Sequence, residues 1–367
     1  MNDELIIGML SGTSRDGVDA VLVNFSHDSM DILHASCTPY PPAIKLTLDQ
    51  LLATGAAPSK DVAELLDDNL GRFFARVAQN LVHDAGMEMR DIRAIGSHGQ
   101  NVWHQPRSKN PLSIQLGRGG LIARNTSTTV VTDFRSADLE AGGQGAPLAP
   151  LFHQKLFHSE KEDRAILNIG GIANLTTLPA KGAVTGFDCG PGNCLMDVWT
   201  NRHLQKEYDD NGRWATKGEL IPDLLSRMLT DPYFNQPPPK STGLEHFNMT
   251  WLENMLGDSA LKEVDVQTTL AELTAISIAE SLTDTGLPAR LLVCGGGVHN
   301  TFLMRRIAAA LPDVIVESTA RHGADPDWVE GLLFAWLARE RLNERTQNTP
   351  PITGADHPVL LGNIHES

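Results

Sequence analysis

The sequence of 367 residues has little cysteine, no basic cluster and no long apolar run. Its four cysteines (Cys37, Cys189, Cys194 and Cys294) form no C-x-x-C pair and lack zinc-ligand spacing. The net charge of −15, without a Lys/Arg block, argues against a nucleic-acid-binding surface. No run of about 18 apolar residues occurs, so no membrane span is expected. We therefore expect a reduced, cytoplasmic protein that binds neither nucleic acid nor membrane.

Two familiar phosphate-binding motifs are also missing. There is no G-x-x-x-x-G-K-[ST], which excludes the usual P-loop, and no G-x-G-x-x-G, which argues against a dinucleotide enzyme. We therefore expect any phosphate bound here to be held by backbone amides and hydroxyl groups, together with a divalent cation.

The chain is long enough for two domains, and both halves begin in the same way. Residues 4–10 and 18–25 predict a hairpin with a glycine-bearing turn, and "AILNIGGIANLTTL" (165–178) repeats the pattern. Helical spacing follows over 58–86 and 266–284, and "WVEGLLFAWLARERL" predicts a last apolar helix. We expect a duplicated α/β architecture with domains 1–143 and 144–367, divided in the loop "RSADLEAGGQGAPLAP". We leave open whether the C-terminal helix packs back on the first domain.

Four glycine-rich stretches each follow a predicted strand: 12–17, 170–171, 190–192 and 295–297. Glycine lets backbone amides approach an anion closely, as in a phosphate-binding nest. An ordinary turn explains any single stretch as well, but four strand ends of this kind favour nucleotide binding.

Asp188, in "GFDCGPGN", is the candidate general base. It is predicted at a strand end, with Pro191 suited to open the following helix. A carboxylate there can activate water or a hydroxyl, although a helix-capping role is the alternative. Asp16 and Asp19 are either turn residues or indirect Mg²⁺ partners through water.

The segment "GSHGQNVWH" is expected to place His98, Gln100 and His104 in one loop. Their donors and acceptors suit sugar hydroxyls, while a structural role is the alternative. Arg135 is suited to bind a carboxylate or phosphate, or to pair with Asp133 or Asp138.

The set of motifs, in its order, resembles the anhydro-N-acetylmuramic acid kinase family. The segments are "GMLSGTSRDGVDAVL", "GSHGQNVWH", "TDFRSADLEAGGQGAPLAP", "LNIGGIANLT", "GFDCGPGNCLMDVW", "PPPKSTGLEHFN", "TTLAELTAISIA" and "CGGGVHN". The resemblance implies an actin-like (ribonuclease H-like) fold of two α/β domains with ATP in a cleft between them. It also implies a reaction in which ATP, water and 1,6-anhydro-N-acetylmuramic acid give N-acetylmuramic acid 6-phosphate, in peptidoglycan recycling.

The resemblance assigns roles to individual residues. Asp188 matches the catalytic aspartate, and Mg²⁺ is expected to arrive with ATP, without a dedicated protein metal site. Substrate contacts are expected from His98, Gln100, Arg135, Asn193 and Glu330. ATP contacts are expected from Gly12, Thr13, Ser14, Arg15, Asp16, Gly17, Val18, Asp19, Gly170, Gly171, Gly295, Gly296 and Gly297. A homodimer would be in keeping with the family.

Three residues depart from the family pattern. Arg15 replaces an apolar residue, Cys189 replaces a threonine, and Gly331 replaces an alanine, which is expected to weaken its helix by up to ~1 kcal/mol. Two other interpretations stay open: a kinase of the same fold for another sugar, and a non-catalytic actin-like ATP-binding protein.

Overall fold

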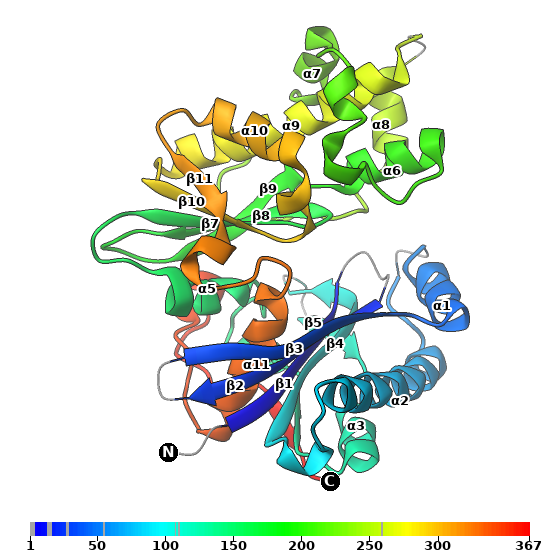
Figure 1. The fold of residues 1–367 in the computed structure, drawn as a ribbon, viewed down its shortest axis with the longest axis vertical. Helices are drawn as coiled ribbons and strands as arrows, with labels where there is room; N and C mark the ends of the chain where they lie inside the picture. The colour runs from blue at the N-terminus through cyan, green and yellow to red at the C-terminus, as the bar shows by residue number, and fades with distance from the viewer. Residues whose placement is uncertain are drawn as a thin grey trace. The chain divides into compact units, whose positions relative to one another are not determined.

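The computed structural model describes residues 4–12, 17–26, 29–53, 56–106, 108, 111–257 and 260–367. It divides the chain into two compact units (Figure 1). The first unit comprises residues 1–152 and 328–367, and the second comprises 153–327. The division thus follows Phe152 rather than residue 143, and the C-terminal segment belongs to the first unit.

The first unit is built on a seven-stranded sheet. Its strands are β1 (Glu4–Ser11), β2 (Gly17–Ser26), β3 (Ser29–Pro39), β4 (Ala94–Gln105), β5 (Leu112–Leu116), β6 (Val130–Thr132) and β12 (Asn363–His365). Its helices include α1 (Pro42–Ala53), α2 (Lys60–Asp84), α3 (Gly119–Thr126), α4 (Ser136–Glu140), α11 (Val329–Leu342) and α12 (Pro350–Thr353). The order is β12-β6-β4-β1-β2-β3, with β5 paired to β4.

The second unit contains a five-stranded sheet of order β11-β10-β7-β8-β9. The strands are β7 (Arg164–Ile169), β8 (Ile172–Leu178), β9 (Thr185–Pro191), β10 (Arg290–Cys294) and β11 (Ile315–Ser318). Its helices include α6 (Cys194–Leu204), α7 (Pro222–Met228), α8 (Met249–Leu256), α9 (Glu263–Thr285) and α10 (Thr301–Ala310), and α5 (Ala149–Phe157) crosses the division.

The two sheets repeat one topology. In the first, β1 pairs with β2 antiparallel, β2 with β3 antiparallel, and β1 with β4 and β4 with β6 in parallel. In the second, β7, β8, β9, β10 and β11 pair in the corresponding directions. The predicted duplicated α/β architecture is confirmed by this repeated topology of the two sheets.

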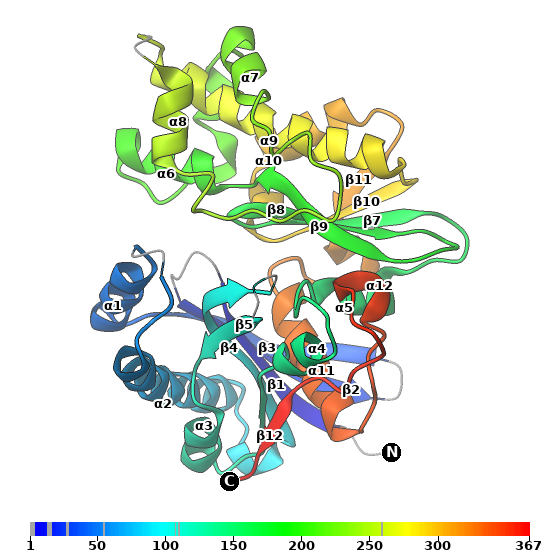
Figure 2. The same ribbon diagram turned by 180° about the vertical axis from the view of Figure 1, so that it is seen from behind.

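Two glycines allow α11 to lie directly on the first sheet. Gly8 of β1 and Gly96 of β4 are register partners, and both face α11. A Cβ at Gly8 would come within 2.0 Å of the Gly331 carbonyl oxygen, and one at Gly96 within 2.1 Å of that of Phe334. Because side chains alternate along a strand, Ile7 and Met9 face the opposite side, where they pack with α2 and α3 (Figures 1 and 2).

Gly331 shows why the expected alanine is absent from α11. A Cβ at this position would lie 3.0 Å from both γ-carbons of Val21, a buried residue of β2. The expected loss of helix propensity is therefore accompanied by closer packing of the helix on the sheet.

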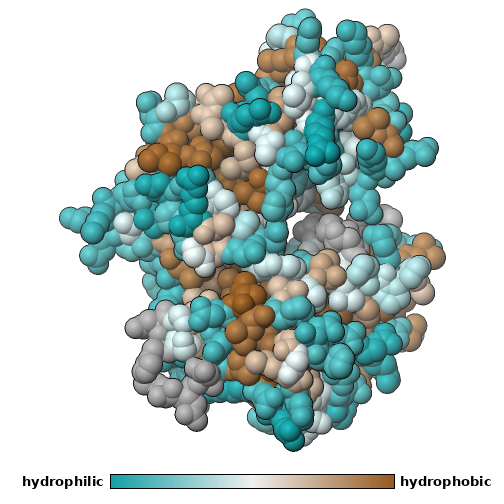
Figure 3. All heavy atoms as spheres, viewed as in Figure 1, coloured by the Kyte–Doolittle hydropathy of each residue, from teal (hydrophilic) through white to brown (hydrophobic). Residues whose placement is uncertain are grey.

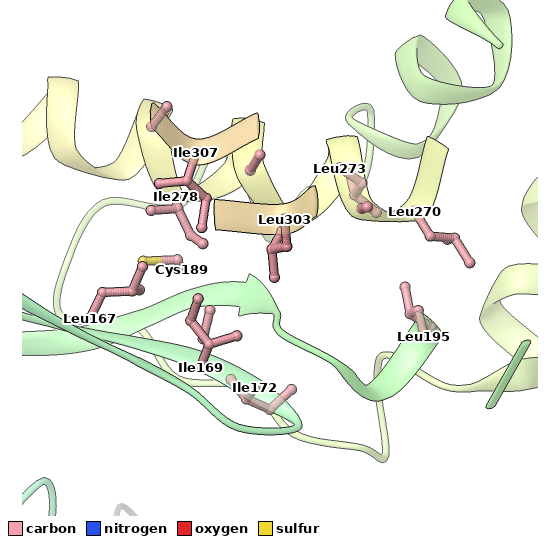
Figure 4. Packing of buried hydrophobic residues seen from close by; sticks show 14 of the residues in the cluster. Leu167, Ile169, Ile172, Cys189, Leu195, Leu270, Leu273, Ile278, Leu303 and Ile307 are labelled. Carbon is pink, nitrogen blue, oxygen red and sulfur yellow. The ribbon is translucent and has the colours of Figure 1, made fainter. Parts of the chain in front are cut away.

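The second unit has its main core on one face of its sheet. Figure 4 shows Leu167 and Ile169 of β7 directed toward Ile278 of α9 and toward Leu303 and Ile307 of α10. The face drawn in Figure 3 is mainly hydrophilic, with hydrophobic side chains in separate areas. Within the part of the chain that the structure describes, no helix is long and apolar enough to cross a membrane.

Candidate active site

The first glycine stretch is only partly described. Thr13, Ser14, Arg15 and Asp16 lie outside the described residues. Gly12 follows β1, whereas Gly17, Val18 and Asp19 already belong to β2 and pair with β3. The strand expected from residue 18 thus begins at Gly17, where the ladder with β3 starts and a Cβ would strike the Thr38 carbonyl oxygen at 2.4 Å.

The expected loop containing His98, Gln100 and His104 is instead part of β4. The segment pairs in parallel with β1 and then antiparallel with β5. These two strands supply its backbone hydrogen-bond partners, which the polar composition of the segment does not predict. Gly99 has a φ of +73°, and the Leu116 carbonyl oxygen lies 2.5 Å from where its Cβ would be. A glycine is therefore required within the strand rather than at a loop.

Gln100 connects β4 to the end of β1. The Ser11 hydroxyl donates to Gln100 Oε1 over 2.7 Å, and Gln100 Nε2 donates to the Asn101 carbonyl oxygen over 3.1 Å. Both residues are at least 95% buried. Gln100 thus fixes the strand end from which the first glycine stretch departs.

His98 and Arg135 form a buried pair. Arg135 donates from Nε (3.1 Å) and Nη2 (3.0 Å) to His98 Nε2, and His98 Nδ1 lies 3.3 Å from the Gly99 carbonyl oxygen. His98 must therefore be neutral, with its proton on Nδ1. Burial and then the charge of Arg135 lower the pKa of His98 to about 3. The ring packs against Phe334 of α11, with ring centroids 4.7 Å apart.

Glu330 and Asp19 are two acidic residues of the first unit that interact electrostatically. Glu330 lies in the first turn of α11 and is solvent-accessible. Although part of the side chain is open to solvent, the surrounding protein desolvates the carboxyl group; this desolvation and then the Asp19 carboxylate raise the pKa of Glu330 to about 7, while the Arg135 charge opposes the shift. Arg135 therefore lies within electrostatic range of both His98 and Glu330, and Glu330 lies within range of Asp19.

Asp188 lies on β9 of the second unit with both carboxylate oxygens engaged. Asn174 Nδ2 donates to Oδ1, and the Thr242 backbone N–H donates to Oδ2 over 2.9 Å. Burial raises the pKa of this carboxyl group; the hydrogen bonds from Thr242 and Asn174 lower it, and the charge of Glu245 raises it. Each oxygen accepts one bond here, which leaves a lone pair on each for a water or hydroxyl proton.

The backbone of Asp188 is held from a proline-rich loop. The Tyr233 hydroxyl donates to the Asp188 carbonyl oxygen over 2.8 Å, and the Asp188 N–H donates to the Lys240 carbonyl oxygen over 3.1 Å. Lys240 Nζ in turn donates to the Phe234 carbonyl oxygen (3.1 Å) and lies over the Tyr233 ring. Asp188 is a strand residue rather than a helix cap.

The predicted helix opening at Pro191 is wrong, because Pro191 ends β9 and α6 begins at Cys194. The strand continues since Pro191 pairs with Ile172 of β8. Cys189 is fully buried, and burial raises the pKa of its thiol to about 12, so it is inert.

The remaining glycine stretches meet around Ile169. The Asn193 N–H donates to the Gly170 carbonyl oxygen (2.8 Å), and Asn193 Nδ2 donates to the Ile169 carbonyl oxygen (3.2 Å). Cβ atoms at Gly295 and Gly297 would come within 2.8 Å and 2.3 Å of atoms of Ile169. The structure therefore brings together Gly170, Gly171, Asn193, Gly295, Gly296 and Gly297.

Sequence reasoning missed the residues that hold Asp188. Asn174 stands in "NIGGIAN" and Thr242 in "PPPKSTG", both within segments that were quoted as motifs. Asn174 stands directly after the apolar pair Ile172 and Ala173 of β8, and this placement was a usable signal. Thr242 acts through its backbone, for which a sequence carries no direct signal.

The whole described chain matches one family model. The model for anhydro-N-acetylmuramic acid kinase aligns with residues 4–367. The chain belongs to the anhydro-N-acetylmuramic acid kinase family. A member from Xanthomonas axonopodis pv. citri is 45% identical over 100% of this chain and 99% of its own length. Members from Pasteurella multocida and Nitrosomonas europaea are each 45% identical over 98% of this chain and over 96% and 99% of their own lengths.

Solved structures outside the family are similar only at a low level. An activator of 2-hydroxyisocaproyl-CoA dehydratase from Clostridium difficile aligns with a TM-score of 0.45 and 13% identity, over 93% of this chain and 96% of its own. A ROK family glucokinase from Streptomyces griseus aligns with a TM-score of 0.43 and 14% identity, over 92% of this chain and 99% of its own. Similarity at this level carries no information about substrate.

Proposed function

We propose that this protein phosphorylates 1,6-anhydro-N-acetylmuramic acid with hydrolytic opening of its anhydro ring, giving N-acetylmuramic acid 6-phosphate and ADP. The observation that carries the proposal is Asp188, a half-buried carboxylate with both oxygens oriented, in a chain that aligns over its length with anhydro-N-acetylmuramic acid kinases. The reaction serves the recycling of peptidoglycan sugars in the cytoplasm.

Asp188 acts as the general base. A water molecule gives a proton to the carboxylate while its oxygen bonds to the anomeric carbon of the sugar. The bond between that carbon and O6 breaks, and O6 takes the phosphoryl group. A base that is partly desolvated, with a raised pKa, is a better proton acceptor than an exposed aspartate. Its two hydrogen bonds fix the direction in which the free lone pairs point.

The residues of the first unit suit the sugar. Arg135 uses Nε and Nη2 on His98, which leaves the Nη1 donors for an acceptor such as the carboxylate of the lactyl group. Glu330 is solvent-accessible, and its ionised form accepts a hydrogen bond from a hydroxyl. His98 orients Arg135 and contributes no charge of its own. Gln100 supports this region through Ser11.

The glycine turns of the second unit fit a nucleotide. No atom lies within 4 Å of a Cβ built at Gly296, and the nearest atom to one at Gly170 lies 3.8 Å away. Their backbone is therefore open to a ligand, as phosphate binding through amides requires. ATP, accompanied by Mg²⁺, supplies the phosphoryl group, and the amides of these turns hold its phosphates. Use of Mg²⁺ and association with a second copy stay predictions.

The test is ADP release by purified protein with Mg·ATP and the anhydro sugar, beside N-acetylmuramic acid and N-acetylglucosamine. Asp188→Asn removes the base but keeps a side-chain oxygen that accepts from the Thr242 N–H. The Asn174 amide can rotate so that its oxygen accepts from the new side-chain amide group at position 188. We expect a loss of roughly 10²–10⁴ in kcat with ATP binding retained. Asp223→Asn, at an exposed carboxylate in α7, is the matched control.

Each alternative function has its own outcome. Turnover with an ordinary sugar alone would assign the protein to a different sugar kinase activity. ATP binding without turnover of any sugar would indicate a non-catalytic ATP-binding protein. Full activity of Asp188→Asn would refute the assignment of the base.

A further inference from the structure

The last strand of the chain lies at the edge of the first sheet, beside the segment that leads to Arg135. Strand β12 pairs antiparallel with β6, with Asn363 opposite Thr132 and His365 opposite Val130 (Figure 2). Arg341 of α11 donates from Nε to the Gly362 carbonyl oxygen over 2.7 Å, which ties the start of β12 to the helix that carries Glu330. The strand therefore has contacts with both elements that present the polar residues of the first unit.

Two side chains of β12 hold the turn after β6. Asn363 Nδ2 donates to Asp133 Oδ2 over 3.0 Å, and His365 Nε2 lies 2.8 Å from the Thr132 hydroxyl. The other oxygen of Asp133 accepts from the Ser136 backbone N–H over 3.1 Å. Both oxygens of the carboxylate are thus used to connect the turn with β12 on one side and with the start of α4 on the other.

The turn needs such support because Asp133 has a φ of +55°. A residue other than glycine occupies this left-handed conformation only where its surroundings maintain it, and aspartate is among the residues that tolerate it best. Phe134 follows and packs against Phe334, with ring centroids 5.5 Å apart. Arg135 comes next, so the direction of its side chain depends on the conformation of Asp133.

We infer that Asn363, acting through Asp133, is a positioning residue for Arg135 and thereby sets the affinity for the sugar. This inference rests on the proposed function, in which Arg135 binds the lactyl carboxylate. Asn363 itself is exposed on the edge strand, and its side chain donates to Asp133. Its effect should be confined to the sugar, while the reaction of bound substrates is unchanged.

The first test is steady-state kinetics of the full-length protein carrying Asn363→Ala. We expect the KM for the anhydro sugar to rise about tenfold, with kcat and the KM for ATP unchanged, since a displaced binding group costs affinity in proportion to its misplacement. Asn363→Asp, which sets a second carboxylate opposite Asp133, should raise the KM further. Asn363→Gln, which keeps the amide donor, should recover much of the loss. Ile364→Ala changes the exposed neighbour on the same strand and should leave the KM unaltered.

A double-mutant cycle separates action through Arg135 from a general loss of structure. If Asn363 acts through Arg135, Asn363→Ala adds nothing to the sugar KM once Arg135 is alanine. Equal effects in both backgrounds, or an unchanged KM in Asn363→Ala, would overturn the inference.

Amide exchange provides a measurement that does not depend on turnover. Asn363→Ala should accelerate hydrogen exchange at Ser136, whose N–H is bonded to Asp133, and Ile364→Ala should not. Unchanged exchange at Ser136 would overturn the inference. A wild-type protein without turnover of the anhydro sugar would refute the proposed function instead, and the positioning role of Asn363 would then be decided by exchange at Ser136.

Discussion

Replacing Gly8 by alanine tests whether close contact between α11 and the sheet holds the first unit together. The new Cβ would lie 2.0 Å from the Gly331 carbonyl oxygen and 2.7 Å from the Ala335 nitrogen, both backbone atoms of α11. Real Cβ contacts under 3.0 Å are essentially never seen, and a backbone atom cannot rotate away. The helix must therefore retreat by about 1 Å.

The expected cost follows from two opposing effects. Overpacking of a dense interior costs about 1–3 kcal/mol, and a contact with backbone belongs at the upper end of that range. Alanine in a strand recovers about 0.5–1 kcal/mol relative to glycine, because the unfolded chain loses less freedom. The net loss in the free energy of unfolding is about 2 kcal/mol. For a unit of this size that lowers the melting temperature by about 4–8 °C.

The assay is calorimetric melting of wild type and Gly8→Ala, together with the KM for the sugar. The KM should rise as well, because α11 carries Glu330 and the Phe334 ring that packs on His98. Gly120→Ala in α3 is the matched control: its Cβ would meet only Arg124 Nη1 at an ordinary 3.6 Å. It should stabilise by about 0.4–1 kcal/mol. A Gly8→Ala protein that melts at or above the wild-type temperature would refute the packing argument.

Three further results are expected. Gly296→Ala should leave the melting temperature unchanged, because a Cβ there meets no described atom within 4 Å. It should raise the KM for ATP at least ~10-fold, because the methyl group fills the space beside the open turn. An unaltered KM for ATP would place ATP elsewhere. Tyr233→Phe removes the hydroxyl that donates to the Asp188 carbonyl oxygen. It should lower the free energy of unfolding, measured in urea, by about 1 kcal/mol and should lower kcat without raising the KM for ATP. An unchanged kcat would show that this hydrogen bond does not position the base. Burial lowers the pKa of His153 to about 3. Because the unfolded state therefore binds a proton before the folded state does as the pH falls below 6.5, the free energy of unfolding should drop by up to about 1.4 kcal/mol per pH unit between pH 6.5 and 3. His153→Gln should reduce that slope, measured by chemical denaturation at several pH values.

The sequence predicted the repeated, local features of the fold well. Apolar alternation before and after each glycine turn located the hairpins β1–β2 and β7–β8, and three- and four-residue spacing located α2 and α9. These signals depend only on neighbours along the chain, which explains their reliability. The return of residues 328–367 to the first unit depends on tertiary packing on Gly8 and Gly96, and the sequence alone left it open.

The polar strand β4 shows where local reasoning fails. Ser97, His98, Gly99 and Gln100 have the composition of a loop, yet they lie in the sheet and are buried. The side chains of Gln100 and His98 are matched by residues distant in sequence: Ser11 lies 89 positions from Gln100, and Arg135 lies 37 from His98. Propensity cannot anticipate partners of this kind, since burial of a polar group is decided by whether the fold supplies a hydrogen bond. The candidate base was found from its motif, whereas the bond from Thr242, 54 positions away, was not.

The repeated topology has a consequence for how such a protein can evolve. In each half the third residue of the second strand faces a residue of the third strand: Asp19 faces Cys37 in one half, and Asn174 faces Asp188 in the other. A duplication of one ancestral unit would have begun with the same side chains at both pairs. A carboxylate now occupies the second strand in one half and the third strand in the other. The two copies thus keep the shared strand order and differ in which strand carries the carboxylate of this cross-strand pair.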